Sequence, residues 1–315
     1  MGGRQSDQIP GQHLAHDTIT SMSMSLDQVT THHDVPTTTV EHHTLFNPAP
    51  EAGVTKYQAP LGNGANLKAL LVNKNTDTLI VCLHGATTRD KQLPRFEWLR
   101  TFRKLDYSSL YFSDPCLELD EKVELAWYTG WKDLDLYPII AEWVEQTARA
   151  IGATKILIFG SSGGGLAALQ ISTCLPGSMA FPHSCQTSIS NYKVLGTRYS
   201  AQRSYLRAVM PHLKPKAQLH ELPEDFDWAE PMGDRLSAIK RYQNAQPNYV
   251  YYLQNKHDYT HMEQHYEPFR EAVESSPNKD RVKFVLYDGP ENHNPPTQPV
   301  LHEHLGYALD WLNSL

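Results

Sequence analysis

The 315-residue sequence lacks the features that mark several common classes of protein. No apolar run approaches the ~18–20 residues that a membrane-spanning helix needs, and the first residues, "MGGRQSDQIPGQHLAHD", lack the apolar core of a signal peptide. Basic side chains are not in excess, because the net charge is −7, so nothing indicates binding to nucleic acid. We therefore expect a soluble, cytoplasmic protein with neither a membrane span nor a nucleic-acid partner.

Cysteine is scarce, and its spacing excludes two further classes. The four cysteines lie far apart without a CxxC pair, so neither a disulfide scaffold nor a zinc site follows from them. Two histidine pairs, at 32–33 and 42–43, have no cysteine or carboxylate cluster to complete a metal site. We expect no metal and no cofactor.

The first 40 residues differ in composition from the rest. They are rich in Thr, Ser, Gln and His, contain no Lys and show no sustained period, which predicts a disordered polar extension over residues 1–40. From about Thr55 the pattern becomes regular, and residues 41–315 are predicted to form a single domain.

Apolar segments of two kinds alternate along this domain. Strands are predicted at 65–73, 77–85, 108–115, 155–160, 178–184, 248–255 and 281–289, and helices at 136–152, 165–172, 261–275 and 299–315. Strands that alternate with helices imply right-handed crossovers and a mostly parallel sheet with helices on both faces, an α/β fold.

Residues 190–247 interrupt the alternation. About sixty residues between two core strands are too many for a simple connection, so a helical cap insertion is predicted there. Its stretch 193–216 carries six basic side chains and no acid, and its stretch 221–234 carries six acids. Such segregated charge is typical of a solvated face; an anionic substrate is the alternative.

The stretch "KILIFGSSGGGLAALQIS", residues 155–172, joins a predicted strand to a predicted helix through a glycine cluster. One interpretation is nucleotide binding, since Gly163, Gly165 and Ala168 match a loose G-x-G-x-x-A pattern. No acid follows about twenty residues on and no G-K-[ST] is present, which disfavours this interpretation. A second interpretation is a sharp corner without chemistry, where glycine permits close packing.

A third interpretation is a nucleophile elbow. Residues 160–164, "GSSGG", fit G-x-S-x-G with Ser162 at the centre. A nucleophilic hydroxyl must stand clear of the sheet, which forces a strained backbone at Ser162 and small residues two positions before and after it. Ser161 is the rival nucleophile, but its frame would place Phe159 where a small residue is required.

An elbow also requires donors for a developing oxyanion. The stretch "TLIVCLHGATT", residues 78–88, ends a predicted strand with His84, Gly85 and Ala86. The backbone N–H groups of Ala86 and Gly163 are the predicted oxyanion hole, and His84 is expected to order the loop.

A carboxylate and a histidine should then follow later strands. Asp258 comes after the strand at 248–255, where capping the next helix is its alternative role. His293 lies in a loop past the last predicted strand. Only His293 combines a loop position with the chain order Ser–Asp–His, and this excludes the competitors His257, His261, His265, His302 and His304.

With these motifs the chain resembles the α/β-hydrolase superfamily over about residues 55–315. The resemblance rests on "HGA" after one strand, "GSSGG" at the elbow, Asp258 after a later strand and "NH" at 293. Gly164-Gly165 extends the glycine cluster and departs from the usual pattern. The insertion at 190–247 lies where that superfamily carries caps, and "WYTGW" and "QTSISNY" resemble relatives that act on bacterial surface polysaccharides.

The sequence indicates less about the substrate than about the catalytic residues. Trp127, Tyr128 and Trp131 follow the strand at 108–115, at the active edge of the sheet, and are predicted to bind substrate; packing under the cap is the equal alternative. Asp114 is expected to form a turn. Gln186 and Thr187 either line the pocket or only end a strand.

The predicted function is therefore that of a serine hydrolase. Ser162, Asp258 and His293 would cleave an ester-type acyl bond through an acyl-enzyme, as a carboxylesterase or deacetylase does, on a small molecule or an acylated carbohydrate. Two alternatives remain, an acyltransferase with the same triad and a non-catalytic binding module on the same fold. Nothing in the sequence predicts the oligomeric state.

Overall fold

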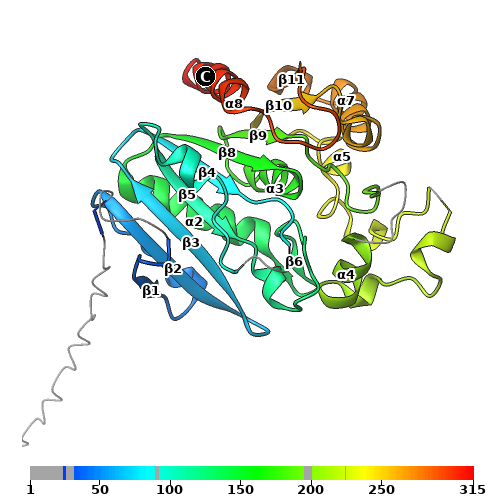
Figure 1. The fold of residues 1–315 in the computed structure, drawn as a ribbon, viewed down its shortest axis with the longest axis horizontal. Coiled ribbons are helices and arrows are strands. Elements are labelled where there is room, and N and C mark those ends of the chain that lie inside the picture. The colour runs from blue at the N-terminus through cyan, green and yellow to red at the C-terminus, as the bar shows by residue number, and fades with distance from the viewer. Residues whose placement is uncertain (1–23, 26–31, 89–91, 195–200, 224) are drawn as a thin grey trace, which may run out of the picture.

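The computed structural model describes residues 24–25, 32–88, 92–194, 201–223 and 225–315. One nine-stranded sheet crosses the molecule in the order β1-β2-β3-β5-β4-β8-β9-β10-β11, from the blue strands at one end to β10 and β11 at the other (Figure 1). Its strands are β1 (Thr37–Thr39), β2 (Gly53–Gly62), β3 (Ala65–Asn73), β4 (Thr78–Leu83), β5 (Ser108–Ser113), β8 (Lys155–Ser161), β9 (Met179–His183), β10 (Tyr249–Asn255) and β11 (Val282–Tyr287). A small hairpin joins β6 (Gly130–Trp131) to β7 (Leu134–Asp135).

The sheet is mostly parallel. Only β3 runs against its two neighbours, β2 and β5, and every strand from β5 to β11 in the sheet order pairs in parallel. The α/β fold predicted from alternating strands and helices is confirmed. The carboxyl ends of β4, β8, β9 and β10 therefore meet at one edge, where the polar loops of the sequence gather.

Helices cover both faces of the sheet. They are α1 (Leu99–Phe102), α2 (Leu136–Ile151), α3 (Gly163–Ser172), α4 (Ala201–Ala208), α5 (Ala238–Arg241), α6 (Tyr259–His261), α7 (Glu267–Glu274) and α8 (Gln298–Asn313). Apolar residues of α2, α3, α5 and α7 form one core on one face, and those of α1 and α8 form another on the opposite face. Strand β8 serves both, because Ile158 enters the first core while Leu157 and Phe159 enter the second.

Several short helical segments complete the chain. The 3-10 segments are η2 (His43–Leu45), η3 (Pro115–Glu118), η4 (Pro211–Leu213), η5 (Leu219–Glu221), η6 (Glu230–Met232) and η8 (Lys279–Arg281), and the π-helical segment is η7 (Met262–Tyr266). The helix predicted over 261–275 is therefore divided into α6, η7 and α7. Pro268 lacks the N–H that a continuous α-helix needs at this point, which accounts for the change of hydrogen-bond pattern before α7.

The polar extension predicted over residues 1–40 is wrong for its last part. Residues 37–39 form β1, which pairs with residues 56–58 of β2, and Val35 and Val40 are buried beside it. The three threonines of β1 are β-branched and favour an extended strand. Residues 1–23 and 26–31 lie outside the described part of the chain.

The insertion predicted over 190–247 is less helical than expected. Its described residues hold α4, which lies near β6, three short 3-10 segments, and α5, which packs against α3 and α7 (Figure 1). Prolines at 211, 215, 223 and 231 remove backbone donors and stop longer helices. Residues 195–200 and 224 lie outside the described part. Within the described ranges, every helix is too short or too polar to cross a bilayer.

Candidate active site

Ser162 occupies the bend between β8 and α3 with a strained backbone. Its φ of 50° and ψ of −120° lie where residues other than glycine are rare. A Cβ atom added to Gly160 would overlap the carbonyl oxygen of Gly164, and one added to Gly164 would overlap the carbonyl oxygen of Leu83, so both flanking positions require glycine. Ser162 is half-buried, whereas Ser161 is buried. The backbone geometry predicted for a nucleophile elbow is present at Ser162.

The loop after β4 lies against this bend. A Cβ atom added to Gly85 would stand 3.3 Å from the Cβ of Ser162. The ring of His84 fixes the loop: its Nδ1 contacts the carbonyl oxygen of Gly85 at 2.7 Å, and its Nε2 accepts from the backbone N–H of Asp114 at 2.9 Å. His84 therefore has the ordering role expected from the sequence.

The two predicted oxyanion donors are available. The N–H groups of Ala86 and Gly163 have no hydrogen-bond acceptor among the described residues. The N–H of Gly85 is not available, because it donates to the Glu97 carboxylate at 2.9 Å. Since Gly163 begins α3, its N–H also lies at the positive end of that helix. An anion beside Ser162 would meet two free donors.

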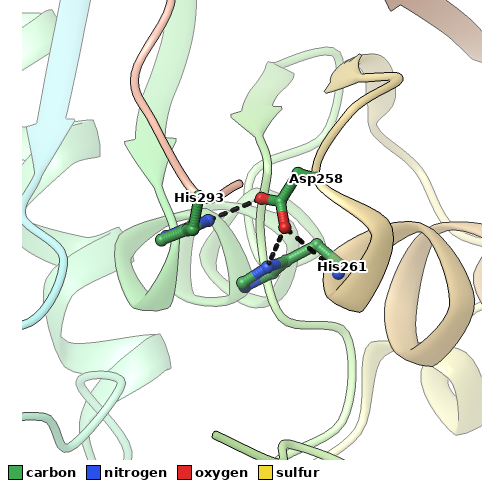
Figure 2. A group of neighbouring side chains, drawn as sticks. All are labelled: Asp258, His261 and His293. Atoms are coloured by element: carbon green, nitrogen blue, oxygen red, sulfur yellow. Dashed lines mark hydrogen bonds and ion pairs between the residues drawn. The ribbon is translucent and has the colours of Figure 1, made fainter. Parts of the chain in front are cut away.

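Asp258 lies between two histidines rather than beside one (Figure 2). The Nδ1 of His293 lies 2.7 Å from its Oδ2, and the Nδ1 of His261 lies 3.0 Å from its Oδ1. The two imidazole rings stack at 4.0 Å with 13° between their planes. Asp258 also caps α6 by accepting from the backbone N–H of His261. The carboxylate thus has both roles that the sequence left open, as a partner of His293 and as a helix cap.

Asn255 brings the two loops of this group together. It is buried at the end of β10, where its Oδ1 accepts from the N–H groups of His257 and Gly289 and its Nδ2 donates to the carbonyl oxygen of Pro290. The N–H of Asn292 donates to the carbonyl oxygen of His257 at 3.0 Å. These bonds fix the loop that carries His293 beside the loop that carries Asp258.

Ser162 itself bonds to a residue of different type. Its Oγ accepts from Nε2 of Gln186 at 3.0 Å, and no hydrogen bond joins it to His293 or His261 among the described residues. The same Gln186 nitrogen lies 2.7 Å from Nε2 of His261. The bond between Ser162 and His293 that a triad uses is therefore not made in this conformation, and such bonds are often long before substrate binds.

Burial and hydrogen bonding set the charges of the group. Burial raises the pKa of Asp258, but hydrogen bonds from His261 and His293 outweigh this effect and hold the pKa well below its usual range. Burial also lowers the pKa of His261 and of its neighbour His265. The group therefore contains a carboxylate anion and, at His261, a neutral imidazole.

The same three side chains could also hold a metal ion. Asp258, His261 and His293 each offer a ligand atom, and these atoms lie within 4.8 Å of one another. Both Nδ1 atoms are engaged by the carboxylate, so a metal would have to replace these two hydrogen bonds. The expectation from the sequence that no metal is needed stays a prediction.

The aromatic residues after β5 are packed rather than open. Trp127 and Tyr128 are fully buried; the indole N–H of Trp127 donates to Oε1 of Gln186, and the hydroxyl of Tyr128 donates to the carbonyl oxygen of Phe112. Trp131 is partly buried against the core. Their burial fits the packing alternative and leaves Trp127 and Tyr128 no exposed face for a substrate. Asp114 forms the expected turn by accepting from the N–H of Cys116.

A cavity of about 540 Å³ adjoins the site. Ala86, Leu125 and Tyr192 line it: a Cβ atom added to Gly163 would overlap the side chain of Leu125, and the ring of Tyr192 lies 6.0 Å from that of His261. Its exposed lining contains three cations, Lys122, Arg203 and Arg207, which we call the cationic rim, and one acid, Glu124. Arg207 pairs with Asp120 at 3.1 Å. The charged lining of the cavity therefore consists of three cations and the carboxylate of Glu124.

The sequence assigns no role at Asp258 to two residues of this group. It leaves Gln186 as either a pocket residue or a strand end, and it disfavours His261, which lies at the helix after Asp258 rather than in a loop. The spacing of Asp258 and His261, i and i+3 on one helical turn, was the available signal, since such residues face each other. Nothing in the sequence around Gln186 indicates that its amide contacts Ser162.

Comparisons with known proteins bear on the fold. No protein-family model matches the sequence, and no curated protein matches it significantly. Among solved structures, the chain is similar to the capsule O-acetyltransferase of Neisseria meningitidis serogroup A, with 14% identity and a TM-score of 0.55, over 83% of this chain and 95% of that one. It is also similar to TT1662 from Thermus thermophilus, with 16% identity and a TM-score of 0.50, over 82% and 98%.

A third similar structure is a larger protein. Prolyl oligopeptidase B from Galerina marginata shares 15% identity with a TM-score of 0.53, over 82% of this chain but only 37% of that one. The chain thus spans little more than a third of that protein. At identities this low, the likenesses show the fold alone. They point to an α/β-hydrolase-like fold, which is the fold that the sequence motifs imply.

Proposed function

We propose that the protein is a serine enzyme that cleaves ester-type acyl bonds through an acyl-enzyme. The observation that carries the proposal is the strained Ser162, which lies near two free backbone donors and is joined through Gln186 and His261 to the carboxylate that binds His293. Strain of this kind persists only where the surrounding structure imposes it. The similarity to acyl-handling and peptide-cleaving enzymes supports this class at the level of the fold.

The reaction starts when Oγ of Ser162 attacks the carbonyl carbon and its proton passes to Nε2 of His293. The carbonyl oxygen becomes an anion that the N–H groups of Ala86 and Gly163 bind, and each such donor contributes about 3–4 kcal/mol in the best-studied case. The bond to the leaving alkoxide then breaks, and the alkoxide takes the proton from His293. Water then attacks the acyl-enzyme in the same way, giving its proton to His293; the acid leaves and His293 returns the proton to Oγ of Ser162.

Asp258 supports both half-reactions. Its bond to Nδ1 of His293 fixes the tautomer that leaves Nε2 free to accept a proton, and its negative charge stabilises the imidazolium that forms. Nε2 of His293 has no bond to a described residue, and the ring is 42% exposed, so it can accept a proton without displacing another group.

A fluorophosphonate probe tests this proposal without knowledge of the substrate, because it reacts covalently with activated serines. We expect the wild-type protein to be labelled, Ser162→Ala to abolish labelling and His293→Ala to suppress it. Ser161→Ala is the matched control, since Ser161 neighbours the elbow but is buried. Labelling that persists in Ser162→Ala and is lost in Ser161→Ala would overturn the assignment.

A second candidate function is acyl transfer to a hydroxyl acceptor. It is favoured by the similarity to a capsule O-acetyltransferase, which covers 95% of that chain. An alcohol in place of water would accept the acyl group from the same Ser162 intermediate. Short acyl esters and acetylated sugars, each incubated with and without an acceptor alcohol, separate the two reactions: a hydrolase releases free acid in both cases, whereas a transferase forms the new ester.

A further inference from the structure

Asp258 has a second imidazole partner that the mechanism above does not use. His261 is buried, and its Nδ1 lies 3.0 Å from Oδ1 of Asp258, the oxygen that His293 leaves free. Its Nε2 faces Gln186, whose amide nitrogen also contacts Ser162. A continuous path of hydrogen bonds therefore leads from the carboxylate through His261 and Gln186 to the nucleophile.

The direction of each bond in this path follows from one fixed donor. The indole nitrogen of Trp127 can only donate, so the atom of Gln186 that faces it at 3.0 Å must be the carbonyl oxygen. The amide nitrogen of Gln186 then donates both its hydrogens, one to Oγ of Ser162 and one to Nε2 of His261. His261 consequently carries its hydrogen on Nδ1 and donates it to Asp258.

We propose, on the basis of the function proposed above, that His261 is a positioning residue that acts on Ser162 through Gln186. Its neutral ring fixes the Gln186 amide, and that amide holds Oγ of Ser162 by a donated hydrogen bond. Because Oγ accepts from Gln186, its own hydrogen is directed to another acceptor, and His293 is the histidine whose Nε2 is free.

The stacked arrangement explains why the two rings have different roles. Two imidazolium rings 4.0 Å apart would repel each other, so one carboxylate can support only one protonated ring at a time. His261 has both nitrogens occupied and little contact with water, whereas His293 is partly exposed with one nitrogen free. The proton from Ser162 therefore goes to His293, and His261 stays neutral.

Two substitutions of His261 separate the two ends of its ring. His261→Asn keeps an amide donor near the position of Nδ1 but removes the acceptor for Gln186, and His261→Gln places its amide near the position of Nε2 but removes the donor to Asp258. Residues that hold a functional side chain in place by a hydrogen bond, as those behind metal-binding histidines do, change activity by roughly 10–100-fold when mutated, and we expect losses of this order in the rate of fluorophosphonate labelling.

His265→Asn is the matched control. His265 is equally buried, its ring lies 5.4 Å from that of His261, and among the described residues it bonds to neither Asp258 nor Gln186. The decrease in the labelling rate of His265→Asn measures the effect of removing a buried histidine from this part of the core. Equal losses in His261→Asn and His265→Asn would mean that His261 has only a packing role, and this would overturn the proposal.

A double-mutant cycle tests whether the effect passes through Gln186. Gln186→Leu removes the bridging amide, so the double variant Gln186→Leu with His261→Asn should label about as slowly as the slower single variant. Losses that multiply would show independent action and contradict the proposal. The free energy of unfolding, measured for each variant in urea, identifies any loss that is due to unfolding.

Proton NMR provides a readout that does not depend on activity. An imidazole Nδ1–H bonded to a carboxylate resonates far downfield, so a His293→Ala sample should keep one such signal, and the addition of His261→Asn to His293→Ala should remove it. Absence of this signal from His293→Ala would overturn the assigned path. If the signal is present but the wild-type protein does not react with fluorophosphonate, the proposed function fails while the hydrogen-bond arrangement stands.

Discussion

Replacement of Asp258 by Asn separates stability from chemistry at this site. The carboxylate is almost fully buried and accepts from the Nδ1–H groups of both His261 and His293. An amide has one acceptor oxygen, so in Asp258→Asn at least one ring faces an N–H instead of an oxygen and must turn or change its tautomer. The wrong tautomer at His293 removes the base for Ser162.

The bonds of Asp258 set the expected loss of stability and the expected loss of activity. One lost hydrogen bond to a charged group costs about 1.5–3 kcal/mol, and the neutral amide recovers part of this because a buried charge is removed. We therefore expect the free energy of unfolding to fall by less than about 3 kcal/mol. The analogous change in the well-studied serine protease triad lowers the rate about 10⁴-fold, and we expect a loss of this order in labelling.

The assay pairs the rate of fluorophosphonate labelling with urea unfolding of the same samples. Asp288→Asn is the control, because Asp288 lies near the same loop but is exposed, and its ion pairs with Lys256 and His257 lie at the surface. It should label like the wild type and unfold at nearly the same urea concentration, because exposed ion pairs contribute little to stability. A folded Asp258→Asn protein that labels at the wild-type rate would refute the reasoning from the carboxylate to Ser162.

Three further predictions concern the surroundings of the site. Gly160→Ala should lower the free energy of unfolding by about 1–3 kcal/mol or more and abolish labelling, because its methyl group would overlap the Gly164 carbonyl. Its control is Gly306→Ala, whose methyl group would meet no atom within 4 Å and should not lower the free energy of unfolding in the same urea measurement. Burial lowers the pKa of His183 to about 3, so only the unfolded protein takes up this proton as the pH falls below 6.5, and the free energy of unfolding should fall by about 1.4 kcal/mol per pH unit. His183→Leu should make the urea midpoint depend less on pH between pH 7 and 5, and an unchanged pH dependence would contradict this prediction. Lys122→Glu should raise KM for anionic esters about fivefold relative to neutral esters at low salt, because reversal of this charge removes ~1 kcal/mol of Coulomb attraction. Equal changes of KM for both kinds of ester would exclude a role for the cationic rim.

The central elements were predictable because each has its own local signal. Strands β8 and β10 are short apolar runs that end in polar loops, and the glycines around Ser162 mark a bend that only small residues permit. The loops that carry Ser162, Asp258 and His293 are then expected to lie close together, because the parallel strands before them end at one edge of the sheet. These parts depend on patterns that lie within a few residues of one another.

The remaining features depend on contacts between distant segments. The edge strand β1 is three threonines that become ordered only against β2, so composition alone suggested an extension without structure. Gln186 and Trp127 are 59 residues apart, and only folding brings the indole N–H to the amide. Burial likewise distinguishes a packed Trp127 from one that lines a pocket, and sequence does not record it.

The two partners of Asp258 come from very different distances along the chain. His261 is three residues away on the same helical turn, whereas His293 arrives on a loop 35 residues later. If that loop swings outward, the buried anion keeps one donor and is never left without compensation. Movement of this loop would break its bonds to Asn255 and His257 as well as the bond between His293 and Asp258, but it would leave the bond from His261 to the carboxylate in place.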